Sequence, residues 1–190
     1  MLLKMPELEV LLHEFKLGIN AYLGNLEDHP EHPSPPKSLK ELIAFNEAHQ
    51  EQVMPFFAQE LFEKAERRGD LSSEIYLESR KECRRLSRQQ GIDAFMQKHG
   101  LDAFIAPTSG PAWLTDSVNG DPVSIETSFT PSAVAGYPGI SVPLGFISGL
   151  PVGLSFYGGA WSERMLLRCA HAFENATKAQ IAPEISCCPT

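Results

Sequence analysis

The sequence has few cysteines and no long apolar run. Its 190 residues include four cysteines, too unevenly placed for a disulfide scaffold, and no Cys-x-x-Cys pair that would suggest zinc binding or redox chemistry. We therefore expect Cys83 and Cys169 to be core residues of helices, and Cys187 and Cys188 to be exposed thiols of a tail. No stretch approaches the roughly 20 apolar residues that a membrane helix needs, and glutamates occupy the N-terminal stretch where a signal peptide would be uncharged. The sequence predicts a soluble, cytoplasmic protein without a membrane partner.

Positive charge is also scarce. The formal net charge is −8, whereas a nucleic-acid or anionic-membrane surface favours a clustered basic face. The one basic cluster, Arg80 to Arg88, has the spacing of a solvated helix face. We therefore predict no nucleic-acid partner.

The usual catalytic and metal-binding motifs are missing. Gly153, Ser155 and Gly158 do not have the G-x-S-x-G spacing, and H-E-x-x-H and glycine-rich phosphate loops do not occur. His29 and His32 could form a metal pair, but they lie in a polar, proline-rich loop without a third ligand nearby, and loop surface is the alternative. We predict no metal site and no cofactor. Carboxylates are plentiful, and the sequence does not decide whether two of them converge.

The most distinctive stretch present is Ala133–Gly159, which is typical of a β-hairpin. Bulky residues alternate with glycine, serine and proline in both of its runs, with Ile147–Gly149 as a three-residue connection. One face of the hairpin is therefore predicted to be bulky and the other nearly bare, which allows another backbone or a ligand to approach closely. We expect the bulky face to be buried under a helix that begins at Ser162.

The remaining pattern predicts one α/β domain spanning residues 1–190. Residues 1–100 should be mainly helical, residues 101–177 should contain strands, a long loop and a closing helix, and residues 178–190 should form a tail. Helices are expected to begin at Pro6, Ser38, Pro55 and Ser72 or Ser73, and Gly91 should kink or break the last of these.

A short apolar run, Asp102–Ala106, is typical of a buried strand. Because it follows a helix, we expect it to pair in parallel with neighbouring strands. The irregular stretch from Thr108 to Ser132 is longer than most loops of a compact domain, which indicates a functional or disordered segment.

The segment Asp102–Glu174 resembles the C-terminal part of the amidase signature family of amide hydrolases. The resemblance rests on D-A-F-I-A-P-T, A-G-Y-P-G-I-S-V-P-L-G-F, G-L-P-V-G-L-S-F-Y-G and E-R-M-L-L, which occur in family order. Upstream, L-L-H-E-F-K and S-L-K-E-L-I-A-F-N are similar to helical segments of the peptide-amidase branch. The resemblance implies a partial amidase-signature fold, with a few strands of a mixed sheet packed with amphipathic helices.

The family's catalytic residues have no counterpart in this sequence. Members of the family use a Ser, cis-Ser, Lys triad in segments N-terminal to the region that this chain resembles. Ser72 and Ser73 are adjacent, but they lie at a predicted helix start without flanking glycines, so the triad serines do not transfer to them. No catalytic residue is assigned.

The resemblance does imply a substrate-binding stretch at Thr127, Ser128, Phe129 and Thr130. The amidotransferase members of the family have an acidic residue there, where this sequence has Thr127, which favours the peptide-amidase branch. An ordinary polar loop is the alternative for these four residues.

Two hypotheses follow. In the first, the chain is the C-terminal part of an amide hydrolase acting on carbon–nitrogen bonds other than peptide bonds, inactive alone, with an N-terminal amidase half carrying the triad as its partner. In the second, it is a non-catalytic binding or interaction module that retains the scaffold. An exposed sheet edge and apolar surface would favour self-association.

Overall fold

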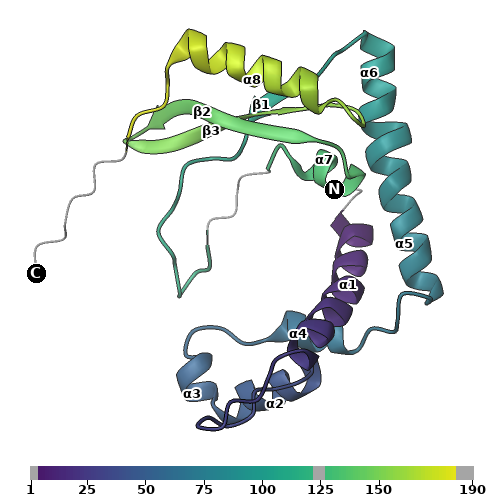
Figure 1. Cartoon of the computed structure of the whole chain (residues 1–190), viewed down its shortest axis with the longest axis vertical. Helices are drawn as coiled ribbons and strands as arrows, with labels where there is room; N and C mark the ends of the chain where they lie inside the picture. The colour runs from purple at the N-terminus through teal and green to yellow at the C-terminus, as the bar shows by residue number, and fades with distance from the viewer. Residues whose placement is uncertain (1–3, 122–126, 183–190) are drawn as a thin grey trace, which may run out of the picture. The chain divides into compact units, whose positions relative to one another are not determined.

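The computed structural model describes residues 4–121 and 127–182, which form a mixed α/β structure (Figure 1). The chain divides into two compact units, unit 1 (Met1–Leu86) and unit 2 (Ser87–Thr190). The arrangement of residues 1–190 as one domain stays a prediction. Cys187 and Cys188 lie outside the described residues.

Unit 1 is helical. Its helices are α1 (Lys4–Gly24), α2 (Leu39–Ala48), α3 (Gln50–Val53), α4 (Glu60–Glu66) and α5 (Glu74–Arg84). The start predicted at Ser38 is confirmed, because the Ser38 hydroxyl accepts a hydrogen bond from the Glu41 N–H at 3.2 Å. Across the described residues, no helix is both long enough and apolar enough to cross a membrane.

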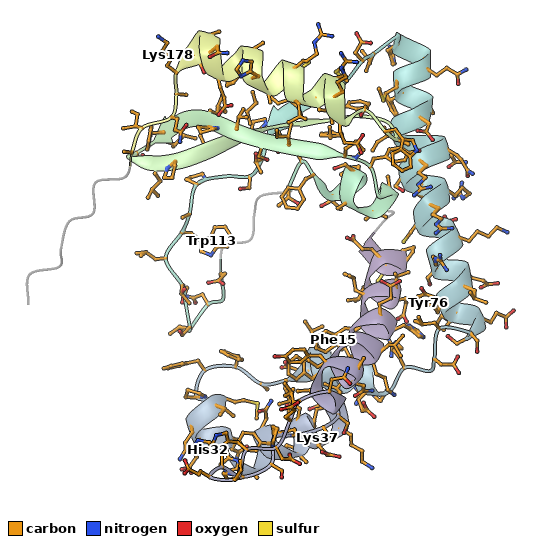
Figure 2. All side chains as sticks on the ribbon, in the orientation of Figure 1. Phe15, His32, Lys37, Tyr76, Trp113 and Lys178 are labelled. Atoms are coloured by element: carbon orange, nitrogen blue, oxygen red, sulfur yellow. The ribbon has the colours of Figure 1, made fainter. Side chains whose placement is uncertain are left out.

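The core of unit 1 lies where α1, α2 and α4 meet. Leu12, Leu39 and Ala65 are buried there. Phe15 of α1, labelled in Figure 2, stacks on Phe62 of α4 with ring centroids 5.4 Å apart. Each helix of this group therefore buries one apolar stripe against its neighbours.

The helix predicted to begin at Pro55 begins at Glu60 instead. Phe56 and Phe57, the two residues after Pro55, lie outside the helix and are 73% and 70% exposed. The Gln59 side chain accepts a hydrogen bond from Asn46 and donates one to the main-chain oxygen of Ile43. These bonds to α2 anchor the start of α4 five residues later than expected.

Unit 2 contains the sheet. After a wide-turn helical segment (η1, Arg85–Ile92), its elements are α6 (Asp93–His99), β1 (Phe104–Pro107), α7 (Thr130–Ala135), β2 (Gly139–Ile147), β3 (Leu150–Tyr157) and α8 (Glu163–Thr177). The kink predicted at Gly91 is confirmed by its non-helical backbone angles, φ −107° and ψ −114°.

The strands pair in the order β1-β3-β2, and both pairings are antiparallel. The expectation that the strand after the helix has parallel neighbours is therefore wrong for the described residues. A short apolar run predicts burial but carries no information on strand direction, which depends on where a free sheet edge lies. Here β1 pairs with the edge of β3 that β2 leaves free.

The hairpin differs from its predicted form at two points. Its connection has two residues, Ser148 and Gly149, both with positive φ (52° and 80°), which matches the twist of tight hairpins. A β-bulge at Leu144 adds one residue to β2 between Pro143 and Gly145. The alternation therefore shifts beyond Pro143, and the predicted bulky face does not continue to the hairpin tip.

The bulky face of the hairpin is buried under α8, as predicted from the sequence. Val142, Leu154 and Phe156 form a core with Leu166 and Ala170 of α8. Figure 1 shows α8 along one face of the hairpin and α7 on the opposite side. This packing leaves the bare face free for other contacts.

Replacing Leu166, which is 2% exposed, with alanine should lower the free energy of unfolding of unit 2. We expect a loss of about 2–5 kcal/mol, from lost transfer energy and the cavity left behind. The matched control Leu167→Ala, at a 58% exposed position of the same helix, should cost less than about 0.5 kcal/mol. Urea denaturation measures both, and equal losses would contradict the assigned core.

Candidate functional site

Three hydroxyl groups form a cluster on the bare face of the sheet. Ser155 on β3 is buried, and its Oγ lies 2.8 Å from both Thr108 Oγ1 and Ser141 Oγ. Thr108 Oγ1 and Ser141 Oγ are 3.2 Å apart. The cluster satisfies the buried Ser155 hydroxyl without a charged group.

Gly153 allows Thr108 to reach this cluster. A Cβ atom on Gly153 would lie 2.8 Å from Thr108 Oγ1 and 3.3 Å from Thr108 Cβ, which is too close for a side chain. A main-chain hydrogen bond also links the two residues, because the Thr108 N–H donates to the Gly153 oxygen at 2.8 Å. The expectation that the bare face admits a closely approaching segment is confirmed, and that segment is the chain after β1.

A cavity of about 390 Å³ opens beside the hydroxyl cluster. It is lined by Thr108, Phe129, Ser132, Ala133, Tyr137, Gly139, Ile140, Ser141, Ser155, Phe156 and Tyr157. None of these described lining residues is charged. The cavity therefore offers hydroxyl groups and aromatic rings, a surface suited to an uncharged ligand.

Tyr137, which lines the cavity, contacts two charged residues that do not line it. Its hydroxyl donates to Asp93 Oδ2 at 3.0 Å, and the Arg88 guanidinium lies 5.1 Å from its ring centroid. Arg88 Nε also donates to the Ala135 oxygen at the end of α7, at 2.7 Å. The helix ends at Gly136, whose φ of 65° favours glycine.

These surroundings change the acidity of the two tyrosines that line the cavity. Burial raises the pKa of Tyr137, and the hydrogen bond to Asp93 and the charge of that carboxylate raise it further, while Arg88 opposes the shift. Burial alone raises the pKa of Tyr157. Both rings are therefore neutral hydrogen-bonding groups at physiological pH.

The four residues predicted to bind substrate lie next to the cavity. Phe129 lines it and is 44% exposed. The Ser128 N–H donates to the Thr108 oxygen at 3.2 Å, and the hydroxyls of Thr127 and Thr130 lie 2.9 Å apart. Phe129 therefore lines the cavity, Ser128 joins the segment to Thr108 of the hydroxyl cluster, and Thr127 and Thr130 bond to each other.

Sequence reasoning identified only part of this arrangement. The sequence predicts that the serines of the hairpin, which include Ser141, lie on the bare face, but it does not assign Thr108, Tyr137 or Tyr157 to a site. The glycines and serines of the hairpin indicated a close approach, yet their pattern could not identify the approaching residue. That depends on the antiparallel register of β1 against β3.

His29 and His32 have ring centroids 4.9 Å apart. Among residues 4–121 and 127–182, no group of three or more histidine, cysteine, aspartate or glutamate side chains is placed to hold a metal ion. The free thiols at Cys83 and Cys169 pack inside their units, the first buried and the second partly exposed.

The Tyr137 hydroxyl should lose its proton only above pH 10, because its pKa is raised from the ordinary tyrosine value of 10.0. Because its folded pKa is raised, the folded state keeps a proton that the unfolded state releases, so stability should fall as pH rises from about 10 through the folded pKa. Asp93→Asn should lower the pKa of Tyr137, whereas Asp121→Asn should not. Tyrosinate absorbance, taken as the difference between each protein and its Tyr137→Phe form, measures this; equal pKa values in both aspartate variants would contradict the assigned contact.

The chain matches the family model for amidases over residues 4–167. It is 36% identical over 177 residues to a probable amidase of Arabidopsis thaliana, a match that covers 92% of this chain and 30% of that protein. It is also 44% identical over 105 residues to a glutamyl-tRNA(Gln) amidotransferase polypeptide of Marinobacter nauticus, covering 54% of this chain and 21% of that protein.

Two solved peptide amidases are similar over nearly the whole chain. One, in complex with the competitive inhibitor chymostatin, has 42% identity and a TM-score of 0.86, covering 96% of this chain and 36% of that one. The native peptide amidase from Stenotrophomonas maltophilia has 40% identity and a TM-score of 0.84, covering 97% and 36%. The chain spans about a third of the length of these relatives. The resemblance seen in the sequence is confirmed, and the chain belongs to the amidase signature family.

Proposed function

We propose that this chain is the part of a peptide-amidase-like hydrolase that supplies scaffold and one wall of the substrate pocket. The reaction of the whole enzyme would be hydrolysis of carbon–nitrogen bonds other than peptide bonds. The Ser, cis-Ser, Lys triad would come from an N-terminal amidase half. The reaction would pass through an acyl-serine intermediate, with backbone amides stabilising the oxyanion. The chain alone would then be inactive on amides.

The observation that carries this proposal is the uncharged cavity on the bare face of the sheet. A substrate pocket needs a concave surface with a few placed polar groups, and the Thr108, Ser141 and Ser155 hydroxyls provide them. The similarity to peptide amidases, with coverage of 36% of their length, supports a role as part of a larger catalytic unit.

The lining of the cavity also supports a choice of substrate class. A ligand with a charged amino group would need a carboxylate partner when desolvated. Thr127 stands where the amidotransferase resemblance implies an acidic residue, and no described lining residue supplies a carboxylate. Neutral amides therefore suit this wall better than the substrate of an amidotransferase.

A chimaera tests the proposal. In it, this chain replaces the matching 36% of the Stenotrophomonas maltophilia peptide amidase. We expect the chimaera to release ammonia from peptide amides, and Phe129→Ala to raise its KM about tenfold by removing one apolar contact with substrate. Phe146→Ala, a similarly exposed phenylalanine outside this cavity, is the matched control and should leave KM unchanged.

The isolated chain should release no ammonia under the same conditions. Ammonia release by the isolated chain that a serine-directed reagent abolishes would contradict the assignment of the triad to the partner. An active chimaera whose KM does not respond to Phe129→Ala would contradict the assigned pocket wall.

Exposed apolar residues at the hairpin tip favour the second candidate, an interaction module. Phe146, Ile147 and Leu150 are 48%, 53% and 41% exposed. The first two end β2, which is an edge strand among the described strands, and Leu150 begins β3. Unpaired strand edges with apolar side chains promote association.

Light scattering coupled to size-exclusion chromatography should accordingly show a dimer or larger species. Ile147→Lys should shift the population to monomer, because it places a charge within the proposed contact. The control Leu167→Lys, at a position on α8 that is 58% exposed, should not. A monomeric wild-type chain with a cooperative melt would count against self-association.

A further inference from the structure

Unit 1, which is separate from the 390 Å³ cavity of unit 2, holds a serine and a histidine in hydrogen-bond contact. Ser73 Oγ lies 3.2 Å from His13 Nε2, although the two residues are 60 positions apart in the sequence. Ser73 immediately precedes α5, and His13 lies on α1. The packing of these two helices within unit 1 therefore brings together a hydroxyl and a potential base.

The hydrogen bonds of His13 fix which ring nitrogen carries the proton. His13 Nδ1 lies 2.8 Å from the main-chain oxygen of Glu9. A carbonyl oxygen can only accept, so Nδ1 must donate, and Nε2 of the neutral ring is left with a lone pair. The Ser73 hydroxyl then donates to Nε2, the direction that general-base activation of a serine requires.

The His13 ring is held in place by its surroundings. It is 1% exposed, and its centroid lies 5.5 Å from that of the Tyr76 ring, which Figure 2 labels on α5. The Tyr76 hydroxyl donates to Glu14 Oε1 at 2.8 Å, which ties the two helices together again. Water therefore has little access to the ring, while Ser73 remains partly exposed.

Space for a small reactant exists beside the pair. His13 and Gly69 both line a cavity of about 280 Å³. Gly69 also adjoins Ser73, because a Cβ atom built on this glycine would lie 4.0 Å from Ser73 Oγ. The cavity also has Lys16 and Arg68 on its wall, but both are engaged: Lys16 Nζ with the Glu66 and Arg68 oxygens, and Arg68 with the Glu9 carboxylate.

The start of α5 contributes a second favourable feature. Ser73 occupies the N-cap position, yet its side chain makes no capping hydrogen bond to the helix, because the hydroxyl faces His13. The first-turn N–H groups of this 11-residue helix carry the positive end of its dipole. They can stabilise negative charge that develops next to Ser73.

We propose that Ser73 is a nucleophile activated by His13, and that it accepts the acyl group of small activated esters. Ser73 Oγ bonds to the ester carbonyl carbon, its proton moves to His13 Nε2, and the C–O bond to the aryl oxide breaks. His13 then releases this proton to solvent, and water cleaves the acyl-serine ester, which yields the carboxylic acid and returns the Ser73 hydroxyl. An aryl oxide is a weakly basic leaving group that departs without protonation, so activated aryl esters are the substrates that demand least of this pair. The inference is independent of the proposed amidase function.

The test treats the full chain with p-nitrophenyl acetate and maps acetylated residues by mass spectrometry. Ser73 should be acetylated about a hundredfold faster than Ser72, the scale of a positioned general base. Ser72 is the internal control, since its hydroxyl donates to the Asp70 carboxylate and not to a histidine. Ser73→Ala should abolish the fast p-nitrophenolate release, and Ser72→Ala should leave it unchanged.

His13→Gln should slow acetylation of Ser73 to the rate of Ser72, with circular dichroism used to check that the helices persist. The comparison of Ser72 with Ser73 in the wild-type chain needs no variant, so a folding defect of His13→Gln cannot obscure it. Equal acetylation of the two serines in the wild-type chain, or fast acetylation of Ser73 that persists in a folded His13→Gln variant, would overturn the proposal.

Discussion

The packing of α8 against one face of the β2–β3 hairpin is the constraint on which unit 2 depends. It buries Val142, Leu154 and Phe156 against Leu166 and Ala170, and so decides which face of the hairpin is core. Because side chains alternate along a strand, the choice also decides which residues remain on the other face. The bare face and its cavity follow from this single burial.

On that bare face, small residues let two segments approach. Gly153 leaves room for Thr108, and the three hydroxyls of Thr108, Ser141 and Ser155 satisfy one another without charge. Tyr137 is one of the aromatic residues that line the cavity beside them, and it contacts Asp93 through its hydroxyl and Arg88 through its ring. The described residues that line this cavity therefore present hydroxyl groups and aromatic rings without a charge.

Unit 1 is organised differently, by polar bonds around one helix. Lys16 of α1 donates to main-chain oxygens at the end of α4, Glu9 binds Arg68, and Glu14 accepts from Tyr76. Partly buried bonds of this kind fix the rotation of helices that apolar contacts alone would allow to turn. The same arrangement sets His13 against Ser73, so the contact that could activate a serine arises from helix packing and from no sequence motif.

Features that depend on neighbouring residues could be predicted from the amino-acid sequence alone. Ser38 with Glu41 set a helix start, Gly91 set a kink, and the alternation of Ile140 and Val142 set the buried face, because each effect acts within one turn or one strand. The resemblance to the amidase signature family predicted the overall fold, which these local features alone do not. Three features could not be predicted in this way, since each depends on a partner distant in sequence: the antiparallel direction of β1, the bulge at Leu144 and the late start of α4. For the same reason, Thr108 and Tyr137 joined the candidate site only when strand register and helix packing brought them to it.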